Sequence, residues 1–157
     1  MKIQLLLIGK TGFSFISEGM EVYTKRIRRY VDFSLRVIPD LKGTASRSID
    51  QIKEEEGKKI LKSLNSGDHV ILLDERGKDP DSFEFARLLE KHMLASVKSL
   101  VFVVGGSYGF SEEVYKRGNS MLSLSKMTFS HQLIRVIFLE QLYRGFTILR
   151  GEPYHHG

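Results

Sequence analysis

Five short apolar runs recur along the chain, and each ends at or beside a glycine, a proline or a charged residue. Runs of this length that are apolar at successive positions are typical of strands buried on both faces of a parallel sheet. We therefore predict five strands, at Lys2–Gly9, Phe33–Pro39, His69–Asp74, Leu100–Val104 and Ser120–Ser125.

Segments with helical periodicity separate these runs. From Phe15 to Val31, apolar residues recur every three or four positions, which indicates one buried helix face. Further helices are expected to begin at Ser48, at Asp81 and at Ser111, and the side-chain oxygens of Asp81 and Ser111 can cap theirs. Strands that alternate with helices in this way predict an α/β protein with a mostly parallel sheet. The length fits a single domain, residues 1–157.

The last predicted helix, His131–Tyr143, is apolar on almost every side. One face packed on one sheet cannot bury all of its apolar residues, which are Leu133, Ile134, Val136, Ile137, Phe138, Leu139 and Leu142. Either the rest of the subunit covers this helix on two sides, or the helix joins two copies of the chain. The second interpretation predicts a homodimer.

Composition excludes several classes of protein. Charged residues make up 27% of the chain and hydrophobic residues 41%, which is ordinary for a globular protein. No apolar run is long enough to cross a bilayer, and the opening segment lacks the features of a signal peptide. The absence of cysteine excludes disulfides and thiolate metal sites. We therefore expect a cytosolic protein with no membrane partner and no metal.

A net charge of +5 favours a polyanionic partner such as RNA. Four of the cations, Lys25, Arg26, Arg28 and Arg29, fall close together near the end of the first helix. They either form a solvated helix end that complements the helix dipole or contact phosphates. The nearby Gly9-Lys10-Thr11 is not a P-loop, because that motif needs a glycine where the chain has Gln4.

The glycine turn at Gly105–Gly109, which follows the fourth predicted strand, has three possible chemistries. Its spacing and its place in the chain do not fit dinucleotide binding. It does fit a hydrolase elbow, G-x-S-x-G, with Ser107 as nucleophile and Glu140 and His155 as the other triad members. Alternatively, the glycines let the backbone approach a ligand closely, or they form a purely structural turn.

Three segments together resemble the SPOUT superfamily of S-adenosylmethionine-dependent RNA methyltransferases. They are LLDERGK (Leu72–Lys78), VVGGSYGFS (Val103–Ser111) and LSLSKMTFSHQLIRVIFLEQLYRGFTI (Leu122–Ile148), and the closing PYH (Pro153–His155) also fits. Within the superfamily, the chain looks like the bacterial enzymes that methylate N3 of a pseudouridine in 23S rRNA. The resemblance extends over all 157 residues.

This resemblance implies a trefoil knot near the carboxyl end, whose loops bind S-adenosylmethionine in a bent conformation. By position, the cofactor site comprises Leu73, Gly105, Leu124, Ser125, Lys126, Met127, Thr128 and Phe129. Relatives dimerise through the last helix. The chain departs from the family at Phe129-Ser130-His131, where a proline usually precedes the histidine, although Ser130 can cap the helix instead.

The resemblance also implies roles for the tail. His155 is a candidate general base and Tyr154 a candidate stacking partner for the target base, both acting across the dimer interface; alternatively, the tail only covers the knot. The chain would then act on 23S rRNA or on a ribosomal particle. The alternatives are a non-catalytic RNA-binding or ribosome-assembly module with the same fold and, more remotely, an esterase using Ser107.

Overall fold

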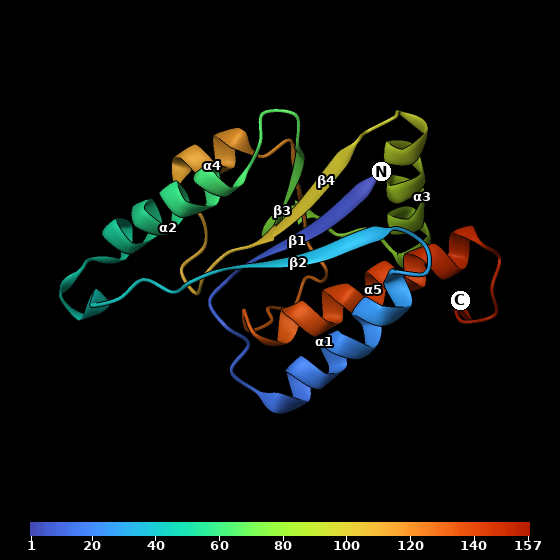
Figure 1. Cartoon of the computed structure of the whole chain (residues 1–157), viewed down its shortest axis with the longest axis horizontal. Coiled ribbons are helices and arrows are strands. Elements are labelled where there is room, and N and C mark those ends of the chain that lie inside the picture. Colours follow the sequence, from blue (N-terminus) through green and yellow to red (C-terminus); the bar gives the residue numbers. More distant parts are fainter.

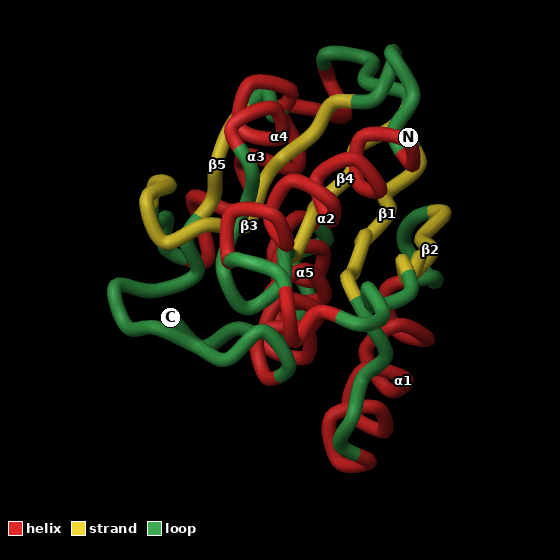
Figure 2. The backbone as a smooth tube through the Cα atoms, turned by 90° about the vertical axis from the view of Figure 1, so that its left-hand side faces the viewer, coloured by secondary structure: helices red, strands yellow, loops and turns green.

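Five parallel strands form a sheet through the centre of the molecule, in the order β2-β1-β4-β3-β5. A computed structural model describes all 157 residues. The strands are β1 (Lys2–Ile8), β2 (Asp32–Ile38), β3 (His69–Lys78), β4 (Ser99–Val104) and β5 (Ser120–Leu122). Because all of them run in one direction, their carboxyl ends meet at one edge. Figure 2 looks toward this edge, with β5 and β2 at opposite sides. The predicted parallel α/β sheet is confirmed.

Helices cover both faces of the sheet (Figure 1). On one face lie α1 (Ser14–Ile27), α3 (Ser82–Leu94) and α5 (Leu133–Leu149); on the other lie α2 (Ile49–Ser63) and α4 (Glu112–Arg117), with a short 3-10 helix, η1 (Thr44–Ser46), before α2. Two apolar clusters match these layers. Phe85, Phe102 and Phe138 meet in the larger one, whereas Val103 and Val114 belong to the smaller. None of the helices has both the length and the hydropathy that crossing a membrane requires.

Polar side chains begin three helices where the sequence predicts them. Ser48 and Asp81 each form a reciprocal capping box, with Gln51 and Glu84 respectively. Ser111 accepts a hydrogen bond from the backbone of the first turn of α4. Each cap satisfies a backbone N–H that would otherwise lack a partner, which is typically worth about 1 kcal/mol.

Two strand ends differ from their predicted positions by more than one residue. β5 stops at Leu122 rather than Ser125, because the side chains of Ser123 and Ser125 bond locally to the backbone instead of leaving it to a strand ladder. β3 continues past Asp74 to Lys78, with a shift of register between Leu73 and Lys78. The extension needs bare backbone at Gly77, where a Cβ would lie 2.6 Å from the Leu122 nitrogen.

α5 is longer than predicted, since it continues past Tyr143 to Leu149. It lies against the sheet with α1 and α3 on either side, and four of its apolar side chains are buried within one subunit: Phe138, Leu139, Leu142 and Phe146. Two-sided cover therefore accounts for much of its apolar character. Leu133, Ile134, Val136 and Ile137 stay at least partly exposed. The trefoil knot stays a prediction.

Candidate active site

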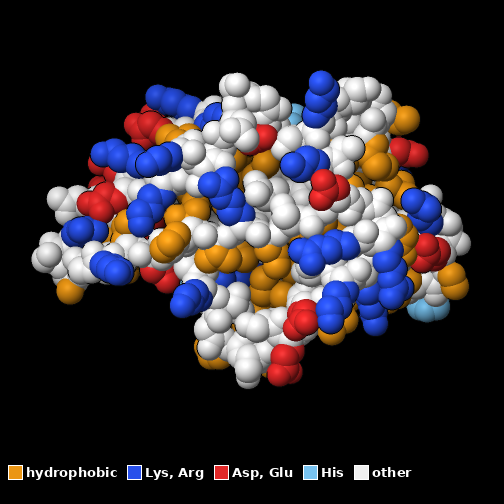
Figure 3. Space-filling model, viewed as in Figure 1, with side chains coloured by type: hydrophobic (Ala, Val, Ile, Leu, Met, Phe, Trp, Pro, Cys, Tyr) orange, Lys and Arg blue, Asp and Glu red, His pale blue; other side chains and the backbone are white.

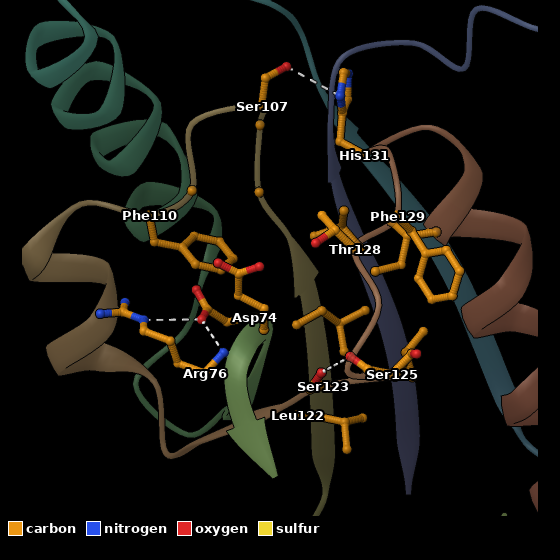
Figure 4. Close-up of a pocket in the computed structure, with 18 of the residues that line it drawn as sticks. Asp74, Arg76, Ser107, Phe110, Leu122, Ser123, Ser125, Thr128, Phe129 and His131 are labelled. Atoms are coloured by element: carbon orange, nitrogen blue, oxygen red, sulfur yellow. Dashed lines mark hydrogen bonds and ion pairs between the residues drawn. The ribbon is translucent and has the colours of Figure 1, made fainter. Parts of the chain in front are cut away.

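A cavity of about 370 Å³ opens at the carboxyl edge of the sheet, where open α/β sheets bind ligands (Figure 4). Its walls come from the end of β3, the β4–α4 loop and the segment between β5 and α5. The lining comprises residues 73–76, 104–110, 122–125 and 127–129, with Tyr115, His131 and Ile134. Chain segments far apart in the sequence thus meet at this cavity.

Most of the predicted cofactor residues lie on the cavity wall. They are Leu73, Gly105, Leu124, Ser125, Met127, Thr128 and Phe129. Lys126 is exposed and does not belong to the lining. The segment is shaped by its own serines, because Ser123 donates to the Ser125 carbonyl at 2.7 Å and Ser125 accepts from the Met127 nitrogen at 2.9 Å.

The glycine turn lets backbone run close to packed side chains beside the cavity. A Cβ on Gly105 would lie 2.9 Å from the ring of Phe110, and one on Gly106 would lie 2.7 Å from the carboxylate of Glu56. Gly109 has a φ of +84°, which other residues rarely adopt. The turn therefore needs glycine for close approach and for backbone conformation, not for a nucleophile elbow.

One carboxylate, that of Asp74, is fixed on the β3 side of the cavity. It accepts hydrogen bonds from the Tyr115 hydroxyl and from the backbone and guanidinium of Arg76, and Figure 4 shows the two bonds from Arg76. The Arg76 guanidinium also lies over the Tyr115 ring, 4.2 Å from its centroid. Burial disfavours the charged form of Asp74, but these bonds outweigh it and lower the pKa of the carboxyl. Asp74 is therefore an anion at neutral pH.

The two loops that flank the cavity are joined by Ser107 and His131 (Figure 4). The Ser107 Oγ lies 3.2 Å from His131 Nδ1. The triad Ser107, Glu140 and His155 does not form, because Glu140 bonds to Tyr154 and Arg144, and His155 faces Arg144. No carboxylate bonds to the free nitrogen of His131 either, so the esterase hypothesis is wrong.

A buried arginine fixes the start of α5 against the end of β1. Arg135, which is fully buried, donates to the carbonyls of Ile8, Gly9 and His131 at 2.7–3.1 Å. Nearby, the Ser130 hydroxyl accepts from the Leu133 nitrogen at 3.1 Å, but α5 begins two residues later than predicted and its N-cap is Gln132, so the predicted cap at Ser130 is wrong. The His131 backbone is therefore held by α5 itself.

The sequence of the whole chain matches one known family. A family model described as "Predicted SPOUT methyltransferase" matches residues 1–155. The chain belongs to this family. Its resemblance to SPOUT methyltransferases, drawn above from four motifs, is thereby confirmed.

Relatives of similar length carry a more specific name. A protein of Parabacteroides distasonis is 54% identical over 156 residues, which is 99% of each chain. Proteins of Flavobacterium johnsoniae and Bacteroides thetaiotaomicron are 53% and 52% identical over the same length and coverage. Each is named ribosomal RNA large subunit methyltransferase H.

The carboxyl-terminal tail of this SPOUT methyltransferase lies away from the cavity of its own subunit. His155 is 3.0 Å from an Arg144 nitrogen and packs edge-on against Phe83, and Tyr154 donates to Glu140 at 2.9 Å. Burial and the bond to Glu140 raise the pKa of Tyr154. The tail lies toward the amino ends of the strands, at the opposite edge of the sheet from this cavity (Figure 1).

The basic residues at the end of α1 differ in how they are engaged. Lys25 pairs with Glu21, Arg28 donates to the Phe33 carbonyl, and Arg26 lies over the rings of Tyr23 and Tyr143. The Arg29 side chain is exposed and makes no hydrogen bond or ion pair. Figure 3 shows lysine and arginine side chains gathering over this part of the surface.

Sequence reasoning did not single out Asp74, Tyr115 or Arg135 as site residues. Asp74 carried a usable signal, because a carboxylate directly after an apolar strand lies at the ligand-binding edge of the sheet. Tyr115 and Arg135 come from helices, and helical periodicity does not tell which turn faces a cavity. No three histidine, cysteine, aspartate or glutamate side chains are grouped to hold a metal ion.

Proposed function

We propose that this protein transfers a methyl group from S-adenosylmethionine to N3 of a pseudouridine in 23S rRNA, in the cytoplasm. The observation that carries the proposal is the cavity that three segments form at the carboxyl edge of the sheet, in a chain that belongs to a family of methyltransferases. Relatives about half identical in sequence are named as methyltransferases of large-subunit ribosomal RNA.

The residues of the cavity fit this methyl donor. Leu122, Leu124, Phe129 and Ile134 offer an apolar slot for adenine, and the exposed backbone after β5 can bond its edge. The anionic Asp74 suits a ligand that carries a positive sulfonium. When bound, the donor supplies a methyl group already activated by the positive sulfur. The protein has to orient the acceptor and accept its proton.

A homodimer would complete the site. Phe13, Phe15 and Val22, at and before α1, are 46–64% exposed, and Leu133 on the neighbouring α5 is 37% exposed. Apolar side chains exposed on two adjacent helices fit the same surface of a second copy, as in an isologous interface. In that arrangement Tyr154 and His155 of each tail approach the target base in the partner's cavity.

RNA would approach through the basic end of α1. Lys25, Arg26, Arg28 and Arg29 supply positive charge on one part of the surface, and phosphate contacts account for much of RNA affinity. The target pseudouridine has to lie in a loop or bulge, because its N3–H is otherwise hidden in a base pair.

The alternative is an RNA-binding module without catalysis, and two measurements decide between them. Calorimetry with S-adenosylmethionine tests the cofactor site, and mass spectrometry of 23S rRNA nucleosides, incubated with protein and cofactor, tests methylation. We expect binding and a new methyl group on N3 of a pseudouridine. Binding of RNA without binding of the cofactor would favour the module.

Asp74→Asn provides a variant of nearly unchanged shape. It should weaken binding of S-adenosylmethionine roughly tenfold, about 1.4 kcal/mol, because the cationic sulfur loses its counter-charge. Binding of S-adenosylhomocysteine, whose sulfur is neutral, should weaken less. Equal losses for the two ligands would mean that Asp74 does not face the sulfonium.

A further inference from the structure

His131 differs from the other histidines in its surroundings. It is the only histidine on the cavity wall. His69 and His92 bond to each other at 3.1 Å on the far side of the molecule, and His155 is held by Arg144. An imidazole at a methyl-transfer site is a candidate proton acceptor, because its charge changes between about pH 5 and 8.

We propose that His131 is the general base that removes the N3 proton of the target base, and that Ser107 positions its ring. This inference rests on the proposed function and names the group that the reaction needs. Three contacts fix the histidine: its Nδ1 meets Ser107, its carbonyl accepts from Arg135, and the next residue, Gln132, bonds to the β1–α1 loop. A base held in this way needs little reorganisation before reaction.

The proton and electron balance of the step is simple. Neutral His131 donates its Nδ1–H to Ser107 Oγ, which leaves a lone pair on Nε2. As N3 of the base bonds to the methyl carbon, the bond between that carbon and the sulfonium breaks and its electron pair stays on sulfur. The N3 proton passes to Nε2, and the imidazolium then releases it to water. Ser107 remains a hydrogen-bond acceptor in both states.

Other titratable groups around the cavity are less suited to this role. Asp74 has a lowered pKa, and burial together with its bond to Asp74 raises the pKa of Tyr115, so that hydroxyl keeps its proton. Arg76 is a cation on the β3 side, where Glu75 is also exposed. Around His131 itself stand Ser107 from the β4–α4 loop and Arg135 from α5, and the next residue, Gln132, donates to the Lys10 carbonyl.

Two substitutions separate a base from a structural link between loops. His131→Asn keeps an N–H near the position of Nδ1, so it can still bond Ser107, but it cannot accept a proton. Ser107→Ala removes the bond and keeps the imidazole. His92→Asn, which changes a histidine on the far side of the molecule, is the matched control. Each variant is assayed for single-turnover methylation across pH, for cofactor affinity by calorimetry and for thermal unfolding.

If His131 is the base, His131→Asn lowers the single-turnover rate by about 10²- to 10⁴-fold, the usual contribution of general base catalysis. Its cofactor affinity and unfolding midpoint stay close to those of the wild type. The wild-type rate falls as the pH drops through the range of imidazole titration, and this fall disappears in the variant. The rate loss in His131→Asn becomes smaller at alkaline pH, because N3 of the target base then ionises in water without a general base. The single-turnover rate of Ser107→Ala falls only roughly two- to tenfold, which is the effect of one neutral hydrogen bond.

A structural link predicts the reverse pattern. His131→Asn would then be nearly normal because the bond is kept, and Ser107→Ala would weaken cofactor binding. That result, or a wild-type pH profile in His131→Asn, overturns the proposal. So does a large rate loss in His155→Asn that abolishes the acidic limb while His131→Asn is active. If the wild type methylates no pseudouridine at all, it is the proposed function that fails.

Discussion

At the scale of single residues, the cavity depends on Asp74 being charged and fixed. Tyr115 and Arg76 both bond to it, and the ring of Tyr115 also supports the Arg76 guanidinium. These contacts come from α4 and from the β3 extension, so the carboxylate links two elements beside the cavity. Its charge therefore matters for stability as well as for the cofactor.

Tyr115→Phe tests this link, because it removes the hydroxyl and keeps the ring. The pKa of Asp74 is lowered in the folded protein, so its stabilising contribution is full above the unfolded value, near 3.8. This contribution is lost as the pH falls through the folded value. We expect the variant to lose about 1.5 kcal/mol of unfolding free energy at pH 7, because the bond is made to a charged group. Urea denaturation at pH 7 and near pH 3 checks this, because the difference in unfolding free energy between the wild type and Tyr115→Phe should shrink in acid.

Gly105→Val tests the close approach of backbone beside the cavity. A Cβ there would press on the Phe110 ring at 2.9 Å, and Phe110 itself lines the cavity. We expect at least tenfold weaker cofactor binding and a stability loss of about 1–3 kcal/mol from overpacking. Gly67→Ala is the control, because open space surrounds that glycine. Unchanged cofactor affinity in Gly105→Val would place the cofactor elsewhere.

At the scale of elements, periodicity and caps predicted the α/β order because each depends on local sequence. Ser48, Asp81 and Ser111 begin helices where expected, whereas β5 and α5 end elsewhere. One of these ends is set by local side-chain bonds, and the other by burial against parts of the chain that the local sequence does not contain. The Ser123 and Ser125 bonds shorten β5, and burial of Phe146 and Thr147 extends α5.

The end of α1 gives a prediction about RNA. Lys25→Gln combined with Arg29→Gln removes two exposed charges without breaking the contacts of Arg26 or Arg28. If both contact phosphates, the slope of log affinity against log salt should become shallower by about 1.4–1.8. Filter binding with an rRNA fragment measures it. The charge-matched control is Arg87→Gln combined with Lys91→Gln, since both residues are exposed on α3. Equal salt slopes for the two double variants would argue against phosphate contacts at α1.

At the scale of the whole molecule, the sequence located the cavity but not its chemistry. Leu73, Gly105 and the segment after β5 were assigned from the family resemblance, and they meet in the structure because strand ends of a parallel sheet converge. The pairing of Ser107 with His131, and of Asp74 with Tyr115, required knowledge of how distant segments meet. The tail was predicted to act in the cavity of a partner subunit, and it lies away from the cavity of its own subunit. Its predicted role therefore still requires a second copy.

Ile137→Glu tests that second copy. Ile137 is half-buried on α5 and lies outside the apolar core cluster, so a charge there should leave the subunit folded. In a dimer formed through α1 and α5, the carboxylate would be buried without a partner, which is costly. We expect light scattering to show monomers and methylation to fall, while cofactor binding and the circular dichroism spectrum change little. Leu94→Glu, at an 80% exposed position at the end of α3, makes the same change of side chain away from that surface and should remain dimeric and active. A dimer that survives Ile137→Glu would show that the partner contacts another surface, and the proposed reach of Tyr154 and His155 into its cavity would fail with it.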